Sequence, residues 1–203
     1  MPHTDIRGLE HVEKARAEGH GIILLQAHFT TLEMGGGMLA LRTPYDANYD
    51  PPKNPMFADW LVMHRKRYVN RMMDNHSIRT MVRYLREGSS VWYSPDQHVA
   101  ESDGGVPTTF FGQDVMTSSG TARMARISKA VVIPYVPYRS QGDHLYRIDI
   151  SPPLEHFPSD DVIADTQRIN DLFEQHIRAH PGQYFWLHKR FKRLHPDQPD
   201  PYA

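Results

Sequence analysis

The sequence predicts an α/β fold in which helices flank a mostly parallel sheet. Two observations lead to this prediction. The apolar run GIILLQ is typical of a strand buried on both faces of a parallel sheet, and SVWYS indicates a second buried strand. Segments with helical spacing stand between such runs, and strands that alternate with helices indicate a parallel α/β architecture.

The totals restrict the class of protein. A chain of 203 residues suits one domain with a sizeable core, so we expect residues 1–203 to form a single domain. With 23 basic and 24 acidic residues, no global field attracts nucleic acid. The lack of cysteine excludes disulfides, thiolate catalysis and cysteine-bound zinc. No apolar run approaches the roughly 18 residues of a membrane span, and the N-terminus is no signal peptide, so we expect a soluble or peripheral chain.

The first half of the chain contains several expected elements in alternation. Three glycines in the second helix lower helix propensity, and close packing of that helix on the sheet explains why they are kept. The spacing of Ile78, Met81, Val82 and Leu85 indicates a later helix. In order, we expect a short helix from residue 9 that stops at Gly19, a strand at 21–26, a helix at 31–42, a short strand at 46–50, helices at 56–72 and 78–87, and a buried strand at 90–94.

The second half begins with a long segment, from Pro95 to Met116, in which we expect no regular element. A loop of this length in a compact domain is usually functional or disordered. A helix is expected at 117–129 and a strand at 130–138. LYRIDI alternates, which predicts a one-sided strand at a sheet edge, and a long helix at 160–180 places apolar residues on one stripe.

His28 stands where a buried strand ends and a helix begins. The pattern His-x4-acid occurs five times in the chain, but only His28 has this context, and ligands bind at the carboxyl ends of strands in α/β sheets. Two interpretations remain open. Thr30 and Glu33 form a capping box, with His28 a structural residue at the sheet edge. Alternatively, Glu33 reaches back to the imidazole, fixes its tautomer and leaves the other ring nitrogen as a general base. Such a pair suits attack by a substrate hydroxyl on an activated acyl group.

Several blocks of the chain resemble a known family. AHFTTLE is similar to the His-x4-Asp/Glu block of glycerolipid-type acyltransferases. Across residues 6–194, a series of blocks resembles the late acyltransferases of bacterial lipid A synthesis, in the same order: IRGLEHVEKARAEGHGIILLQAHF, PPKNP, VWYSPDQ, VPTTFFG, TARMARISKAVVIPYVPYR and QYFWLHKRFK.

The resemblance implies a glycerolipid-acyltransferase-like fold and an enzyme at the cytoplasmic face of the inner membrane. It would move a fatty acyl chain from acyl carrier protein to a hydroxyl of a Kdo-bearing lipid A precursor. The acyl thioester would be a co-substrate, with no cofactor and no metal. Family members usually carry an N-terminal membrane anchor and are longer, so we expect this chain to be either a fragment or a natural short form.

The resemblance also implies site residues. His28 would be the base and Glu33 its partner, with Asp96 and Gln97 as further residues at the substrate. The chain departs from the family at Thr30, Thr31 and Leu32, where glycine, asparagine and tryptophan are usual, and at His98, where an acid is usual. These departures bear on the identity of the acceptor more than on the class of reaction.

Basic and aromatic residues suggest further substrate contacts. By the same resemblance, Arg65 and Arg79 would recognise a substrate phosphate, for which a guanidinium is well shaped. Phe110 and Phe111 would border the cleft and touch either the acyl chain or the core. Two basic clusters, RKRYVNR at 65–71 and HKRFKR at 188–193, are either solvated surfaces or sites for phosphate and for acidic acyl carrier protein.

Other functions are weaker alternatives. The chain could be a non-catalytic domain that binds acyl lipids or acyl carrier protein, or an acyltransferase with a glycerolipid acceptor. No nucleic-acid-binding module is recognisable. Asp96-x-His98 is a weak metal-ligand pattern, and there is no HExxH motif.

Overall fold

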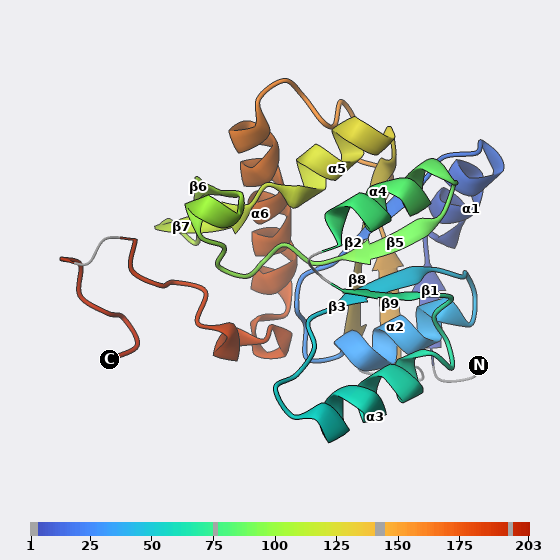
Figure 1. The fold of residues 1–203 in the computed structure, drawn as a ribbon, viewed down its shortest axis with the longest axis horizontal. Coiled ribbons are helices and arrows are strands. Elements are labelled where there is room, and N and C mark those ends of the chain that lie inside the picture. The colour runs from blue at the N-terminus through green and yellow to red at the C-terminus, as the bar shows by residue number, and fades with distance from the viewer. Residues whose placement is uncertain (1–3, 75–76, 141–144, 195–196) are drawn as a thin grey trace.

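The computed structural model describes residues 4–74, 77–140, 145–194 and 197–203. Within these residues the chain alternates between strands and helices (Figure 1). The strands are β1 (Thr4–Arg7), β2 (Ile22–Leu25), β3 (Asp46–Tyr49), β4 (Met72–Asp74), β5 (Ser90–Tyr93), β6 (Gly105–Phe110), β7 (Gln113–Ser118), β8 (Val131–Arg139) and β9 (Tyr146–Ile150). The α-helices are α1 (Leu9–Ala17), α2 (Leu32–Ala40), α3 (Pro55–Arg65), α4 (Ile78–Arg86), α5 (Gly120–Ser128) and α6 (Val162–Ala179), with 3-10 turns at Glu101–Asp103, Pro181–Gln183 and Trp186–His188.

Seven of these strands form one sheet in the order β1-β9-β8-β2-β5-β3-β4. Neighbouring strands run parallel except β8 and β9, which are antiparallel. The predicted α/β fold with a mostly parallel sheet is therefore confirmed. All four residues of β2 are buried, and β2 lies between β8 and β5, so the chain that leaves β2 emerges near the middle of the sheet edge.

Helices cover both faces of the sheet. Because successive strand residues point to opposite faces, Ile23 and Leu25 of β2 pack in one core cluster, while Ile22 and Leu24 pack in the other. The first cluster includes side chains of α4, α5 and α6, and the second includes side chains of α1 and α2. Figure 1 shows the same division, with α4, α5 and α6 on one side of the sheet and α2 and α3 on the other.

The glycines of α2 allow that helix to approach the sheet closely. A Cβ atom on Gly35 would lie 2.1 Å from Cβ of Pro137 in β8, and one on Gly36 would lie 2.9 Å from the Tyr45 hydroxyl. A Cβ atom on Gly37 would meet nothing within 4 Å. Close packing thus explains two of the three glycines.

The expectation of an irregular segment from Pro95 to Met116 is wrong. Strands β6 and β7 form an antiparallel hairpin, which turns at Phe111 and Gly112, both with positive φ. Its polar threonines and Pro107 hid the strand pattern in the sequence. A two-stranded ribbon tolerates proline because every strand in it has a free edge. The hairpin is held on α6, where Asn170 Nδ2 donates to Thr108 Oγ1 at 3.0 Å.

Three other expectations differ from the structure. The helix expected from residue 117 begins at Gly120, because Thr117 and Ser118 are the end of β7. Helix α3 ends at Arg65 and not near residue 72, because the following residues turn back so that Val69 is buried and Arg71 pairs with Asp46. Strand β9 is not at the sheet edge, because β1 pairs with it in parallel and forms the edge. The four residues of β1 are too few to show a periodic pattern.

Candidate active site

Two neighbouring parallel strands deliver the central residues of the site. Residues Ile22 to Leu25 of β2 pair with Ser90 to Tyr93 of β5, so both strands end at the same edge of the sheet. His28 follows β2, and Ser94 and Asp96 follow β5. The backbone N–H of His28 donates to Asp96 Oδ2 at 2.8 Å, which fixes the two loops against each other.

The imidazole of His28 is hydrogen-bonded to a buried carboxylate, that of Asp96. Nδ1 of His28 lies 2.6 Å from Oδ1 of Asp96, whose side chain is 1% exposed. Asp96 also accepts hydrogen bonds from the hydroxyls of Ser94, at 2.9 Å, and Tyr184, at 3.0 Å. With this set of donors, Asp96 holds the ring in one orientation and favours the tautomer with its proton on Nδ1.

The charges of the pair stabilise each other. Burial opposes ionisation of Asp96, but the charge and hydrogen bonds of His28 and the hydroxyl of Ser94 outweigh it and hold the pKa of Asp96 well below its ordinary value. Burial likewise lowers the pKa of His28, but the carboxylate of Asp96 more than compensates and raises that pKa above 6.5. Burial and the charge of Asp96 raise the pKa of the Tyr184 hydroxyl, which therefore stays a donor. His28 is thus a stronger base than a free histidine.

The other ring nitrogen of His28 lies at a cavity. Nε2 of His28 is 3.4 Å from the side-chain nitrogen of Gln97, which also lies 3.3 Å from Nδ1 of His188. The rings of His28 and His188 have their centroids 4.5 Å apart. Burial and the neighbouring His28 lower the pKa of His188.

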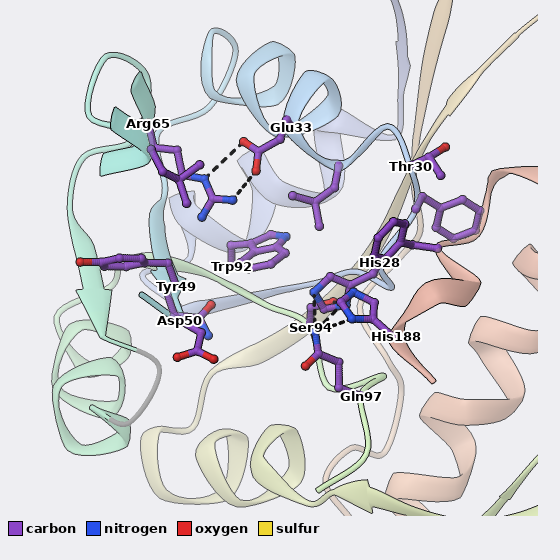
Figure 2. Close-up of a pocket in the computed structure, with 15 residues that line it drawn as sticks. His28, Thr30, Glu33, Tyr49, Asp50, Arg65, Trp92, Ser94, Gln97 and His188 are labelled. Atoms are coloured by element: carbon purple, nitrogen blue, oxygen red, sulfur yellow. Dashed lines mark hydrogen bonds and ion pairs between the residues drawn. The ribbon is translucent and has the colours of Figure 1, made fainter. Parts of the chain in front are cut away.

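The cavity has a volume of about 370 Å³ and combines polar and apolar walls. Figure 2 shows His28, Gln97 and His188 on one side, Trp92 in the middle, and Glu33 with Arg65 on the far side. Side chains from β3, α3, β5 and the segment after α6 complete it. The lining residues are His28, Phe29, Thr30, Leu32, Glu33, Asn48, Tyr49, Asp50, Leu61, Arg65, Trp92, Ser94, Gln97, Phe185 and His188.

The expected hydrogen bond between Glu33 and His28 is not formed. Glu33 instead accepts two hydrogen bonds from the guanidinium of Arg65 and one from the Tyr68 hydroxyl, at 3.2 Å. Its position on α2 directs its carboxylate toward α3 and away from His28 (Figure 2). The partner of the imidazole is Asp96, which was expected to contact substrate and is too deeply buried to do so.

The expected capping box is also absent. Helix α2 begins at Leu32, its N-cap is Thr31, and no side chain caps it. The Thr31 hydroxyl donates to the carbonyl oxygen of Pro137 at 2.6 Å instead. Because Glu33 takes no part in capping α2, its carboxylate can pair with Arg65.

The remaining predicted site residues divide into two groups. Arg65 and Gln97 line the cavity, as expected. Arg79 is exposed in the first turn of α4 and does not line it. Phe110 is fully buried and Phe111 packs beside it, so both belong to the core beneath the hairpin and neither lines this cavity.

The two basic clusters contain structural cations. Arg71 pairs with Asp46 at 2.7 Å. Arg190 is 2% exposed and donates to the carbonyl oxygen of Met116 at 2.7 Å and to the Thr117 hydroxyl. Lys189 and Lys192, in contrast, are exposed. Arg71 and Arg190 therefore have structural partners within the protein, so fewer cations of these clusters are available to bind a phosphate.

Sequence reasoning missed Ser94, Tyr184 and His188. A signal existed for Ser94, because SPDQ directly follows a buried strand, as His28 does. No spacing pointed to Tyr184 or His188, which reach the site after α6. There the main chain is tied to the loop of His28, because the N–H of Phe185 donates to the carbonyl oxygen of His28 at 2.8 Å.

Comparisons with known proteins agree on one family. A family model described as bacterial lipid A biosynthesis acyltransferase matches residues 1–193. The chain is 34% identical over 190 residues to the lipid A biosynthesis lauroyltransferase of Escherichia coli K12, covering 93% of this chain and 62% of that protein. It is 30% identical over 188 residues to the lipid A biosynthesis palmitoleoyltransferase of the same organism, covering 93% of this chain and 61% of that protein. The chain thus spans about three fifths of these relatives.

A solved structure supports the fold. The 1-acyl-sn-glycerophosphate acyltransferase PlsC from Thermotoga maritima superposes with a TM-score of 0.52 at 15% identity, covering 89% of this chain and 73% of that chain. The expected glycerolipid-acyltransferase-like fold is therefore confirmed. Within the described part of the chain, no helix combines the length and apolarity that crossing a bilayer requires.

Proposed function

The chain belongs to the bacterial lipid A biosynthesis acyltransferase family, and from this membership we propose that it transfers a fatty acyl chain to a lipid hydroxyl. The donor is acyl carrier protein or another acyl thioester, and the acceptor is a lipid A precursor or a related glycolipid. The observation that carries the proposal is the pair formed by His28 and Asp96, with Nε2 of His28 at a cavity of about 370 Å³.

In the proposed reaction, Nε2 of His28 takes the proton of the acceptor hydroxyl as the oxygen attacks the thioester carbonyl carbon. Asp96 keeps Nδ1–H in place and stabilises the imidazolium that forms. The tetrahedral intermediate then collapses, the carbon–sulfur bond breaks, and the departing thiolate takes the proton from Nε2. The products are an ester and a free thiol, and neither a covalent acyl-enzyme nor a cofactor takes part.

Glu33 serves this reaction through Arg65 and not through His28. Its carboxylate holds the guanidinium, whose side chain is only 15% exposed, at the wall of the cavity. A guanidinium in that position suits a phosphate group of the acceptor. Glu33 is therefore a positioning residue in this proposal.

The acidic carrier protein approaches the exposed Lys189 and Lys192, which lie near the end of the chain beside His98 and Tyr202. Attraction between exposed charges accelerates encounter and weakens at high salt. Transfer takes place at the cytoplasmic face of the inner membrane, where the protein makes peripheral contact with lipid.

The test is an acyl-transfer assay with a radiolabelled acyl donor and membranes prepared from cells that express the full gene. Acyl carrier protein thioester is the donor, and a Kdo-bearing lipid A precursor is compared with a glycerolipid acceptor. The His28→Ala enzyme should be slower by about 10²–10⁴-fold, the usual contribution of a general base. Its thermal unfolding should match wild type, which separates lost chemistry from lost fold.

Two results would contradict the proposal. Turnover by the His28→Ala enzyme equal to that of wild type would exclude His28 as the general base. Binding of acyl lipid or carrier protein without turnover by wild type would favour the non-catalytic binding domain. If the enzyme prefers the glycerolipid acceptor, the proposed acyl transfer stands, but the acceptor is a glycerolipid and not a lipid A precursor.

A further inference from the structure

Helix α3 is apolar yet has no buried residue. Met56 is 79% exposed, Phe57 50%, Trp60 48% and Met63 54%. At about 100° per residue these four side chains fall within one third of the helix circumference. We name them the α3 apolar surface. A contiguous group of large apolar side chains marks an interaction site more often than scattered ones do.

A neighbouring face of α3 belongs to the candidate active site. Leu61 and Arg65 project from that face and line the cavity of His28. The α3 apolar surface therefore lies beside the part of α3 that forms a wall of the cavity. In Figure 1, α3 lies at the periphery of the molecule next to α2. Met34 on α2 and Leu41, the residue that follows α2, are also exposed, 48% and 61% respectively.

Exposed cations lie at both ends of α3. Lys53 precedes the helix, and Lys66 and Arg67 follow it; all three are exposed. Asp59 is the one acidic residue within α3. Basic residues beside exposed Trp, Phe and Met side chains are the composition of helices that lie in the interface of anionic bilayers.

We propose that α3 docks on the surface of an anionic lipid bilayer, with the α3 apolar surface inserted among the headgroups and Lys53, Lys66 and Arg67 on lipid phosphates. This inference rests on the proposed function, which requires a lipid acceptor to reach the cavity. Docking through α3 places Leu61 and Arg65 directly above the membrane surface, so an acceptor enters the cavity without leaving the interface completely.

Other occupants fit the surface less well. A second copy of the chain would need to bury about 1,200–2,000 Å² in total for a stable dimer. A helix of 11 residues is only about 16 Å long and cannot supply that area alone. An acidic carrier protein would be recognised mainly by cations, which the exposed Lys189 and Lys192 provide elsewhere.

The experiment measures binding of the full chain to vesicles without turnover. Vesicles of phosphatidylcholine alone are compared with vesicles containing phosphatidylglycerol, by co-sedimentation at low and high salt. The test variant is Phe57→Ser/Trp60→Ser. The matched control is Ile127→Ser, since Ile127 on α5 is 50% exposed and lies outside the α3 apolar surface. Thermal unfolding of each protein verifies its fold.

Wild type should bind the anionic vesicles, and the double variant should bind at least about 10-fold more weakly, because burial of the exposed half of each side chain contributes a factor of roughly 3–10 and the two factors multiply. The control should bind like wild type. Brominated lipids should quench wild-type fluorescence more than that of Trp60→Phe, which places Trp60 in contact with lipid.

Three outcomes would overturn the inference. If wild type does not bind vesicles, or if the double variant binds them as well as wild type does, the α3 apolar surface does not dock on a bilayer. Loss of a dimer in the double variant, without vesicle binding by wild type, identifies a second copy. Loss of carrier-protein binding alone identifies that protein. If wild type binds vesicles through α3 but never transfers acyl groups, the docking inference stands and the proposed function fails.

Discussion

Replacing Asp96 by asparagine tests which carboxylate serves His28. The oxygen of the asparagine can take the place of Oδ2, which accepts from the backbone N–H of His28 and from Tyr184, so the local fold should survive. Its amide nitrogen then faces Nδ1 of His28, where Oδ1 now lies at 2.6 Å. An amide donates to Nδ1, which forces the ring proton onto Nε2 and removes the base.

The expected magnitude follows from that change of tautomer. Since the base is lost, kcat should fall by about 10²–10⁴-fold, as for removal of the imidazole itself, while the KM for the acceptor changes little. A neutral His28 is required, so wild-type activity should rise with pH through the pKa of His28, which Asp96 raises above 6.5. In Asp96→Asn no carboxylate raises the pKa of His28, whereas burial still lowers it. The acid limb, which is the rise of activity on the low-pH side of the profile, should therefore move to lower pH.

Glu33→Gln is the matched control, because it makes the same chemical change at the carboxylate first expected to pair with His28. Glu33 contacts Arg65 and Tyr68, so this variant should raise the acceptor KM and leave the acid limb in place. The assay is the pH dependence of kcat and of kcat/KM for both variants. The reasoning is refuted if Glu33→Gln moves the acid limb while Asp96→Asn leaves kcat and the limb unchanged.

Three further predictions concern neighbouring features. Arg65→Ala should weaken binding of a phosphate-bearing acceptor about 10–150-fold, because a charge-assisted hydrogen bond contributes about 1.5–3 kcal/mol; equilibrium binding measures this, and unchanged affinity would exclude Arg65 from the acceptor site. Tyr184→Phe removes a donor to Asp96 and should lower kcat about 2–10-fold with acceptor KM unchanged, as steady-state kinetics would show; a raised KM at constant kcat would argue for a substrate contact instead. Gly35→Ala should lower the free energy of unfolding by about 1–3 kcal/mol through its clash with Pro137, whereas Gly37→Ala should raise it by up to about 1 kcal/mol; equal effects in urea unfolding would contradict the packing explanation.

The sequence by itself determined the class of fold and the location of the candidate site. The buried strands at 22–25, 90–93 and 131–139 follow from apolar runs, because a strand covered on both faces needs apolar side chains at every position. His28 was recognisable because it follows such a strand and precedes a helix. The series of motifs identified the family before any geometry was known. These features are local, and local patterns are what a sequence displays directly.

Tertiary structure alone decided which groups act together. Glu33 is five positions from His28 in the chain, but α2 directs it to Arg65; Asp96 is 68 positions away, and the pairing of β2 with β5 places it 2.6 Å from the ring. Tyr184 reaches the same carboxylate from after α6. A hydrogen bond depends on the relative placement of two strands to within a few tenths of an ångström. That placement results from packing across the whole sheet, which spacing along the chain does not record.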